Sequence, residues 1–315
     1  MAQKVYVGGG KCKRMRAETN FLFKLLRCTA ICCIALCNAT CKSSHGGFIT
    51  LRDCSLYYEE RGVGEPLIFI HGHSLDSRMW QNQVEQFSEE YRVITYDARG
   101  YGLSSKQQEG LLFTHADDLY ALMDSLRIGK AHLVGLSMGG FIVGDMLAIY
   151  PERLLSATMC EGHIRSTPSI NQPTSEAERI EKQRSIDAVN REGLTAYKRR
   201  WFSNLMNGGS KVSQIGDRLW EMIDHWDGWQ ATHHEVHCYY GNEAMDSLKS
   251  RQPSIPTLFI EGQRPDGATP QPNKMMHYLP NCKMVTIPDC GHLINMERPK
   301  EFNEALSHFL TSIKR

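Results

Sequence analysis

Ser137 lies between two glycines, Gly135 and Gly139, in the pattern Gly-x-Ser-x-Gly. The apolar run at 131–135 predicts a strand before the serine, and the apolar spacing at 139–149 predicts a helix after it. A serine on such a turn exposes its hydroxyl at the edge of a sheet, and the helix directs its first amides toward a developing negative charge. The pattern therefore predicts a nucleophile, although an ordinary glycine-rich turn with a capping serine would show the same residues.

His292 has the chemistry of a general base. It follows Gly291, after a predicted strand at 283–287 and before a predicted helix at 299–313. An imidazole beside a serine hydroxyl accepts its proton during attack on a carbonyl carbon and returns that proton to the leaving group. Ser137 and His292 together predict acyl transfer through a covalent intermediate.

These motifs and their order resemble the α/β-hydrolase superfamily, and the resemblance runs from about residue 48 to residue 313. A His-Gly pair that ends a buried strand is a motif of that superfamily, and this chain has it at 71–72. The resemblance implies that the amides of His73 and Met138 form an oxyanion hole. It also implies that His292 is the base and that the reaction needs no cofactor or metal.

Within the superfamily, the stretch from Met79 to Gly100 is most similar to enol-lactonases and small carboxylesterases. A serine at position 137 differs from the aspartate that haloalkane dehalogenases and epoxide hydrolases carry there. The resemblance implies a serine hydrolase that cleaves a small carboxylic ester or lactone through an acyl-enzyme. Aminopeptidases, carbon–carbon bond hydrolases and non-catalytic ligand-binding members of the same fold stay open as alternatives.

The acid of a Ser-acid-His triad is where the chain departs from the family pattern. The family usually has an aspartate where this chain has Pro265. Asp266 follows in a segment similar to the family's Asp-Pro-x-x-Pro, so a one-residue insertion would make Asp266 the acid. A plain β-turn is the other interpretation of that segment. Glu161, which follows a predicted strand at 154–159, is the alternative acid.

Predicted strands alternate with predicted helices along most of the chain. This order favours an α/β-hydrolase fold with a mostly parallel sheet of about eight strands, covered by helices on both faces. Strands are predicted at 48–54, 55–61, 67–71, 92–96, 131–135, 154–159, 257–261 and 283–287. Helices are predicted at 78–90, 113–126, 139–149 and 299–313. Asp97 and Arg99 are interpreted as residues that stabilise turns.

A polar and helical stretch at about 161–252 interrupts this alternation, so we expect a helical cap inserted into a hydrolase domain at 48–315. Four tryptophans in it are expected to form the cap's core, and some of them to line a substrate pocket: Trp201, Trp220, Trp226 and Trp229. His233 and His237 have the spacing of metal ligands on one helix face. We interpret them as polar surface residues and predict no metal site.

Residues 1–47 differ in composition from the rest of the chain. Residues 1–16 contain five basic residues and no acidic one, and the segment 28–37 is uncharged. A basic start before a short apolar run favours a secretory signal peptide with a linker, and hence export to the periplasm or the exterior. Met15 begins a segment of signal-peptide length, so Met1 and Met15 are both candidate starts. A membrane or lipid anchor is one alternative, because acylated cysteines could share one side of a helix here: Cys28, Cys32, Cys33, Cys37 and Cys41. A cytoplasmic extension is the other alternative.

Composition excludes several other functions. The chain has 315 residues, with 36 basic and 35 acidic side chains and a formal net charge of +1. This balance provides no basic surface for nucleic-acid binding. The cysteines after residue 47 are odd in number and widely spaced, which does not fit a disulfide framework. The oligomeric state is left open.

Overall fold

The computed structural model describes residues 44–314 apart from 166, 169–174, 235–237 and 267–273. The predictions of a signal peptide, an anchor and an alternative start fall mainly on residues 1–43, which lie outside the described residues. No helix among the described residues has the length and apolar character needed to cross a membrane.

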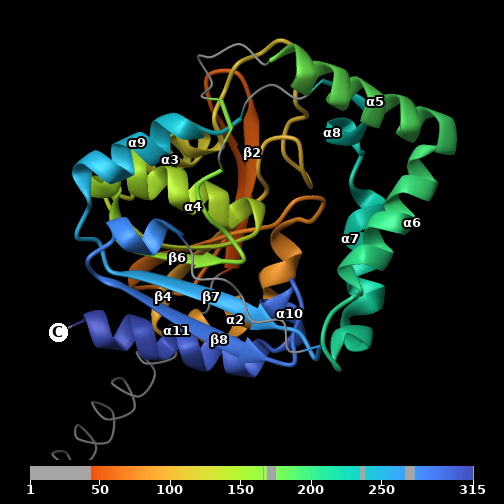
Figure 1. The fold of residues 1–315 in the computed structure, drawn as a ribbon. Helices are drawn as coiled ribbons and strands as arrows, with labels where there is room; N and C mark the ends of the chain where they lie inside the picture. Colours follow the sequence, from red (N-terminus) through yellow and green to blue (C-terminus); the bar gives the residue numbers. More distant parts are fainter. Residues whose placement is uncertain (1–43, 166, 169–174, 235–237, 267–273, 315) are drawn as a thin grey trace, which may run out of the picture. The chain divides into compact units, whose positions relative to one another are not determined.

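An eight-stranded sheet in the order β1-β2-β4-β3-β5-β6-β7-β8 forms the centre of the fold (Figure 1). β1 and β2 form an antiparallel hairpin, β2 is antiparallel to β4, and every other pair is parallel. The strands are β1 (Ser44–Thr50), β2 (Ser55–Arg61), β3 (Glu65–Ile70), β4 (Tyr91–Tyr96), β5 (Ala131–Leu136), β6 (Leu154–Cys160), β7 (Thr257–Gln263) and β8 (Cys282–Pro288). The predicted mostly parallel sheet of about eight strands is confirmed.

Helices cover both faces of this sheet (Figure 1). One face carries α3 (His115–Ser125), α4 (Met138–Ile149) and α9 (Asn242–Arg251), and the other carries α2 (Gln81–Phe87), α10 (Ile294–Glu297) and α11 (Pro299–Ile313). Successive side chains of a strand point to opposite faces, so β3 sends Ile68 and Ile70 into one apolar core and Leu67 and Phe69 into the other. We call the sheet and these helices the body.

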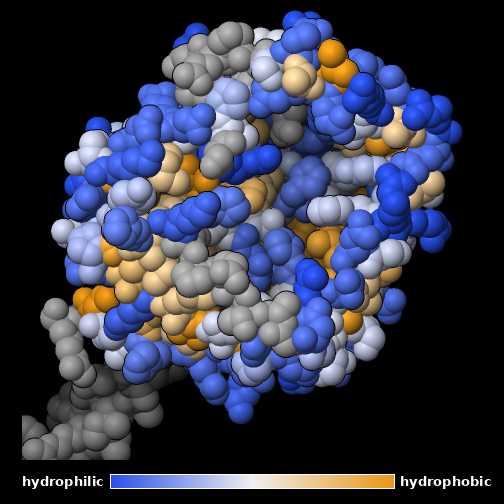
Figure 2. Space-filling view, in the orientation of Figure 1, coloured by the Kyte–Doolittle hydropathy of each residue, from blue (hydrophilic) through white to orange (hydrophobic). Residues whose placement is uncertain are grey.

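The cap consists of α5 (Glu176–Glu192), α6 (Leu194–Leu205), η3 (Val212–Ile215), α7 (Gly216–His225) and α8 (Trp229–Thr232). Mostly hydrophilic side chains cover its outward side, and hydrophobic ones appear where α7 faces the body (Figure 2). Helix α9 lies within the stretch predicted as cap but packs on α4, where Ser247 Oγ donates to the carbonyl of Ala148 at 2.8 Å. The chain has therefore returned to the body by Asn242.

The helix predicted at 78–90 is divided in two. A 3-10 turn, η1 (Ser77–Trp80), precedes α2 because Asp76 caps the amide of Arg78, and Trp80 has φ −94° and ψ 8°, outside α-helical geometry. The helix predicted at 113–126 begins later, at His115, because the side chain of Thr114 accepts a hydrogen bond from the amide of Asp117.

The start of α4 is packed against the end of β3. A Cβ atom on Gly139 would lie inside van der Waals contact with the carbonyl of Ile70. Glycine at this position therefore lets the helix that follows Ser137 approach the sheet. Gly129, by contrast, has open space where its Cβ would be.

Gly139→Ala is expected to lower the free energy of unfolding by about 1–3 kcal/mol, because helix or strand must move apart. Gly129→Ala is the matched control and is expected to change it by less than about 0.5 kcal/mol. Urea denaturation measures both values. Equal stability of the two variants would contradict the close packing described here.

Candidate active site

Ser137 joins β5 to α4 in a strained backbone conformation, with φ 56° and ψ −111°. Its amide donates to the carbonyl of Cys160 on β6 at 2.8 Å, and its carbonyl accepts from the amide of Phe141 at 3.0 Å. Non-glycine residues adopt positive φ rarely and at a cost, which packing on both sides must offset. The side chain is partly exposed, while its neighbours Leu136 and Met138 are buried. The strand, turn and helix predicted around this serine are confirmed.

The loop after β3 passes directly beside Ser137. A Cβ on Gly72 would lie 3.7 Å from the Cβ of Ser137. The buried ring of His71 fixes this loop, because its Nε2 accepts from the amide of Ala98 at 2.9 Å and its Nδ1 lies 2.8 Å from the carbonyl of Gly72. The Nδ1 therefore carries the proton and donates it to that carbonyl.

The amides of His73 and Met138 are the predicted oxyanion-hole donors. Met138 is the first residue of α4, so its amide has no acceptor within the helix. Neither amide donates a backbone hydrogen bond to another residue in the described part of the chain. Within the described residues, both amides therefore lack a backbone acceptor, as the donors of an oxyanion hole must.

The side chain of His73 faces the cap. Its Nδ1 lies 2.8 Å from the hydroxyl of Tyr101, and its ring centroid lies 4.9 Å from that of Trp226 and 5.8 Å from that of Trp201. Burial, helped by the charges of Lys182 and Arg165, lowers the pKa of His73 to about 4. The imidazole is therefore neutral near pH 7. Two of the four cap tryptophans thus contact the residue that carries a predicted oxyanion-hole amide.

His292 lies beside Glu161. The Nδ1 atom of His292 is 3.8 Å from Oε2 of Glu161. The other carboxylate oxygen of Glu161, Oε1, accepts from the amide of Gly262 at 2.8 Å. Glu161 directly follows Cys160, the hydrogen-bond partner of Ser137, so the three side chains start from one edge of the sheet. A separation of 3.8 Å is an ion-pair distance and exceeds a hydrogen bond, as is common at catalytic sites without substrate.

Asp266 has a different position. It lies in an exposed turn after β7, next to the segment 267–273 outside the described residues. The structure thus brings a carboxylate oxygen of Glu161 to within 3.8 Å of His292 Nδ1. Both carboxylates stay candidates for the acid, with the geometry favouring Glu161.

Glu261 was missed by the sequence reasoning. It is 9% exposed at the end of β7, beside Gly262, and its carboxyl group hydrogen-bonds to that of Glu161. Burial and the charge of Glu161 raise the pKa of Glu261 to about 8. Two carboxylates in contact cannot both ionise without a large penalty, so Glu261 holds a proton and donates it to Glu161 near pH 7. A glutamate inside the apolar run of β7 was the available sequence signal.

Asp97 and Arg99 have the structural role that was predicted. The carboxylate of Asp97 accepts from the amides of Ser77 and Leu103, at 2.9 and 2.8 Å. The guanidinium of Arg99 is buried and binds both carboxylate oxygens of Asp118. These contacts stabilise the turns near the loop that follows β3 (residues 71–74), which we call the oxyanion loop.

The histidines of the cap do not assemble a metal site in the part of the chain that is described. His233 stacks on Trp229, with centroids 4.7 Å apart. His237 lies outside the described residues.

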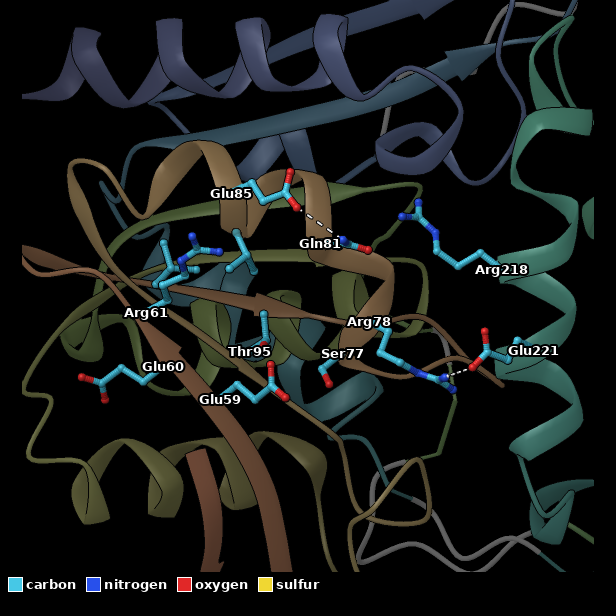
Figure 3. Close-up of a pocket in the computed structure, with 12 residues that line it drawn as sticks. Glu59, Glu60, Arg61, Ser77, Arg78, Gln81, Glu85, Thr95, Arg218 and Glu221 are labelled. Carbon is cyan, nitrogen blue, oxygen red and sulfur yellow. Dashed lines mark hydrogen bonds and ion pairs between the residues drawn. The ribbon is translucent and has the colours of Figure 1, made fainter. Parts of the chain in front are cut away.

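A separate cavity of about 390 Å³ lies between the body and α7, with walls from β2, β4, η1, α2 and α7 (Figure 3). None of the predicted catalytic residues lines it. Two residues that line it, Arg78 of η1 and Glu221 of α7, are in contact at 2.6 Å (Figure 3). Arg78 also binds Asp76 at 2.8 Å. The ion pair between Arg78 and Glu221 links the cap to the segment that follows the oxyanion loop.

Comparison with known proteins identifies the family. The family model for the alpha/beta hydrolase fold matches residues 65–299. The chain belongs to this family. The 3-oxoadipate enol-lactonase 1 of Acinetobacter baylyi is 30% identical over 250 residues, which are 79% of this chain and 89% of that protein.

Solved structures agree with this assignment. A thermophilic esterase from Thermogutta terrifontis has a TM-score of 0.70 and 28% identity, covering 85% of this chain and 99% of its own. A bromoperoxidase from Bacillus anthracis has a TM-score of 0.67 and 26% identity, covering 85% of this chain and 100% of its own. The α/β-hydrolase resemblance predicted from the sequence is thus confirmed, while the named activities of these relatives differ from one another.

The proton on Glu261 predicts a pH effect in this α/β hydrolase. Above a pH of about 8, Glu261 ionises, stops donating to Glu161, and adds a second negative charge beside it. Repulsion between the two carboxylates would then move Glu161 away from His292, so the rate at which a fluorophosphonate modifies Ser137 should fall above that pH in the wild type. In Glu261→Gln, whose amide donates at every pH, the alkaline decrease should be absent.

Glu261→Leu serves as the control, since it removes the donor without adding a charge, and it should be slow across the whole pH range. Superimposable alkaline limbs for the wild type and Glu261→Gln would show that Glu261 has no such role.

Proposed function

We propose that this protein is a serine hydrolase that cleaves a carboxylic ester or lactone. The observation that carries the proposal is the strained turn at Ser137, which lies beside the His73 loop and on the same sheet edge as Glu161 and His292. The names of an enol-lactonase and an esterase among its relatives support this choice over other reactions of the fold. The substrate is a small molecule that enters between the cap and the body.

In the proposed reaction, Ser137 Oγ attacks the carbonyl carbon while His292 Nε2 accepts the hydroxyl proton. The carbonyl oxygen becomes an oxyanion bound by the amides of His73 and Met138. The intermediate collapses, the bond to the leaving alkoxide breaks, and His292 donates its proton to that oxygen. In a lactone, the alcohol stays attached to the acyl group.

Water then completes the reaction. His292 accepts a proton from water, the hydroxide formed attacks the acyl carbon, and the second tetrahedral intermediate releases Ser137 with the proton returned by His292. The product is a carboxylic acid, and the protein is left unchanged.

Glu161 is proposed to orient the imidazole and to stabilise its cation. It is the carboxylate within 3.8 Å of His292 Nδ1, and the amide of Gly262 holds it in place. Asp266, the acid predicted from the family pattern, is the competing assignment. Export of the hydrolase through the segment 1–47 is a separate prediction that the described residues do not address.

Ser137→Ala is expected to reduce kcat for ester hydrolysis by about 10⁴-fold or more, because the nucleophile is lost. A fluorophosphonate should label the wild type at Ser137 and leave the variant unlabelled, as peptide mass spectrometry would show. Ser203→Ala, on the exposed side of α6, is the matched control and should behave as the wild type. Labelling of a different residue in the wild type would refute the assignment.

Glu161→Gln is expected to lower kcat by about 10²–10⁴-fold, because an amide holds the imidazole without stabilising its cation. Asp266→Asn, which makes the same change in an exposed turn, should lower kcat by less than about threefold. Steady-state kinetics with one ester compares the two directly. The opposite ranking would make Asp266 the triad acid.

A further inference from the structure

Two cationic side chains have contacts that lead to the proposed site. Arg165 follows β6 and is exposed, with its guanidinium 5.5 Å from the ring centroid of Phe141 and 5.4 Å from that of Tyr239. Phe141 lies one helical turn after Ser137 on α4, where its amide donates to the carbonyl of Ser137. The guanidinium therefore lies over the aromatic surface next to the nucleophile.

Lys182 reaches the same region from cap helix α5. Its Nζ donates to the carbonyl of Gln230 at 2.8 Å. The Gln230 side chain accepts from the indole of Trp226 and donates to the carbonyl of Gly100. Trp226 in turn contacts the ring of His73, so the contacts of Lys182 lead to the oxyanion loop.

Both charges act on His73. Lys182 and Arg165 each lower the pKa of that imidazole, which places both cations close enough to repel a proton there. Burial lowers this pKa most, and the His71 imidazole also contributes. Both positive charges therefore act at His73 although the net charge of the chain is +1.

Neither cation is neutralised by direct contact with a carboxylate in the described part of the chain. The hydrogen bond of Lys182 goes to a carbonyl oxygen, and the contacts of Arg165 are with aromatic rings. The charge of Arg165 acts on Asp145, but that carboxyl group is buried and accepts from the amide of Tyr240. Burial raises the pKa of Asp145 to about 7. An exposed guanidinium on aromatic rings is well suited to bind a planar anion.

We infer that Arg165 and Lys182 form a subsite for a carboxylate group, and that the substrate is an ester or lactone carrying a free carboxylate on its acyl chain. The inference rests on the proposed function, since it concerns the acyl group that Ser137 would accept. Arg165 would bind the carboxylate directly, and Lys182 would contribute its charge from the cap. Because the imidazole of His73 is neutral, it adds no charge of its own to this subsite.

The test compares two esters that differ by one charged group, 4-nitrophenyl hexanoate and the mono-4-nitrophenyl ester of adipic acid. The wild type is expected to show a kcat/KM about 10–100-fold higher for the adipate ester, the range of a charge-assisted hydrogen bond. Arg165→Gln should abolish most of that preference, Arg165→Lys should keep part of it, and added salt should reduce it in the wild type.

Arg184→Gln provides the matched control. Arg184 lies on α5, is exposed and pairs with Glu181 at 3.6 Å, so the variant removes the same charge from the outer side of the cap. It should keep the full preference for the adipate ester. An equal preference in the wild type and Arg165→Gln, or no preference in the wild type, would overturn the inference.

A binding measurement separates this inference from the proposed function. Calorimetry with Ser137→Ala should show adipate binding more tightly than hexanoate, and the added substitution Arg165→Gln should remove the difference. If Ser137→Ala hydrolysed both esters as well as the wild type, the proposed function would fail while adipate binding could still support the subsite. If the wild type required Ser137 yet did not distinguish the two acids in either assay, the function would stand and the subsite would be refuted.

Discussion

The positive φ of Ser137 is the constraint on which the proposed site depends. This single residue connects β5 to α4 and places its own side chain at the edge of the sheet. It is held on one side by the hydrogen bond to Cys160 and on the other by the first turn of α4. The same packing brings the His73 loop against the serine, so strain in one residue positions both nucleophile and oxyanion donors.

Electrostatics divides this site into two sides. Glu161 and the protonated Glu261 lie on the His292 side, where a negative charge stabilises an imidazolium. Arg165, which follows β6, and Lys182 of the cap act on His73, where their positive charge would also attract an anionic substrate group. Because the cap supplies Lys182, the arrangement also depends on how α5 is attached to the body.

Local patterns predicted the fold and the nucleophile because these features depend on residues that are close together in the sequence. Short apolar runs located the strands, and the final helix was predicted at its observed bounds, 299–313. Contacts between residues on different strands were harder to predict. Glu161 lies near His292 because β6, β7 and β8 are neighbours in the sheet. Asp266 matched a linear motif, but a motif does not state which carboxylate lies beside the imidazole. Arg165 had no motif at all, because its role follows from the aromatic rings beneath it.

The central claim is that the turn at Ser137 places a nucleophile beside the two amides that bind the oxyanion. A crystal structure of the wild type modified by a fluorophosphonate tests it most directly. We predict phosphorus bonded to Ser137 Oγ, with the phosphoryl oxygen about 2.7–3.1 Å from the amide nitrogens of His73 and Met138. Phosphorus on another residue, or a phosphoryl oxygen directed away from both amides, would contradict the account.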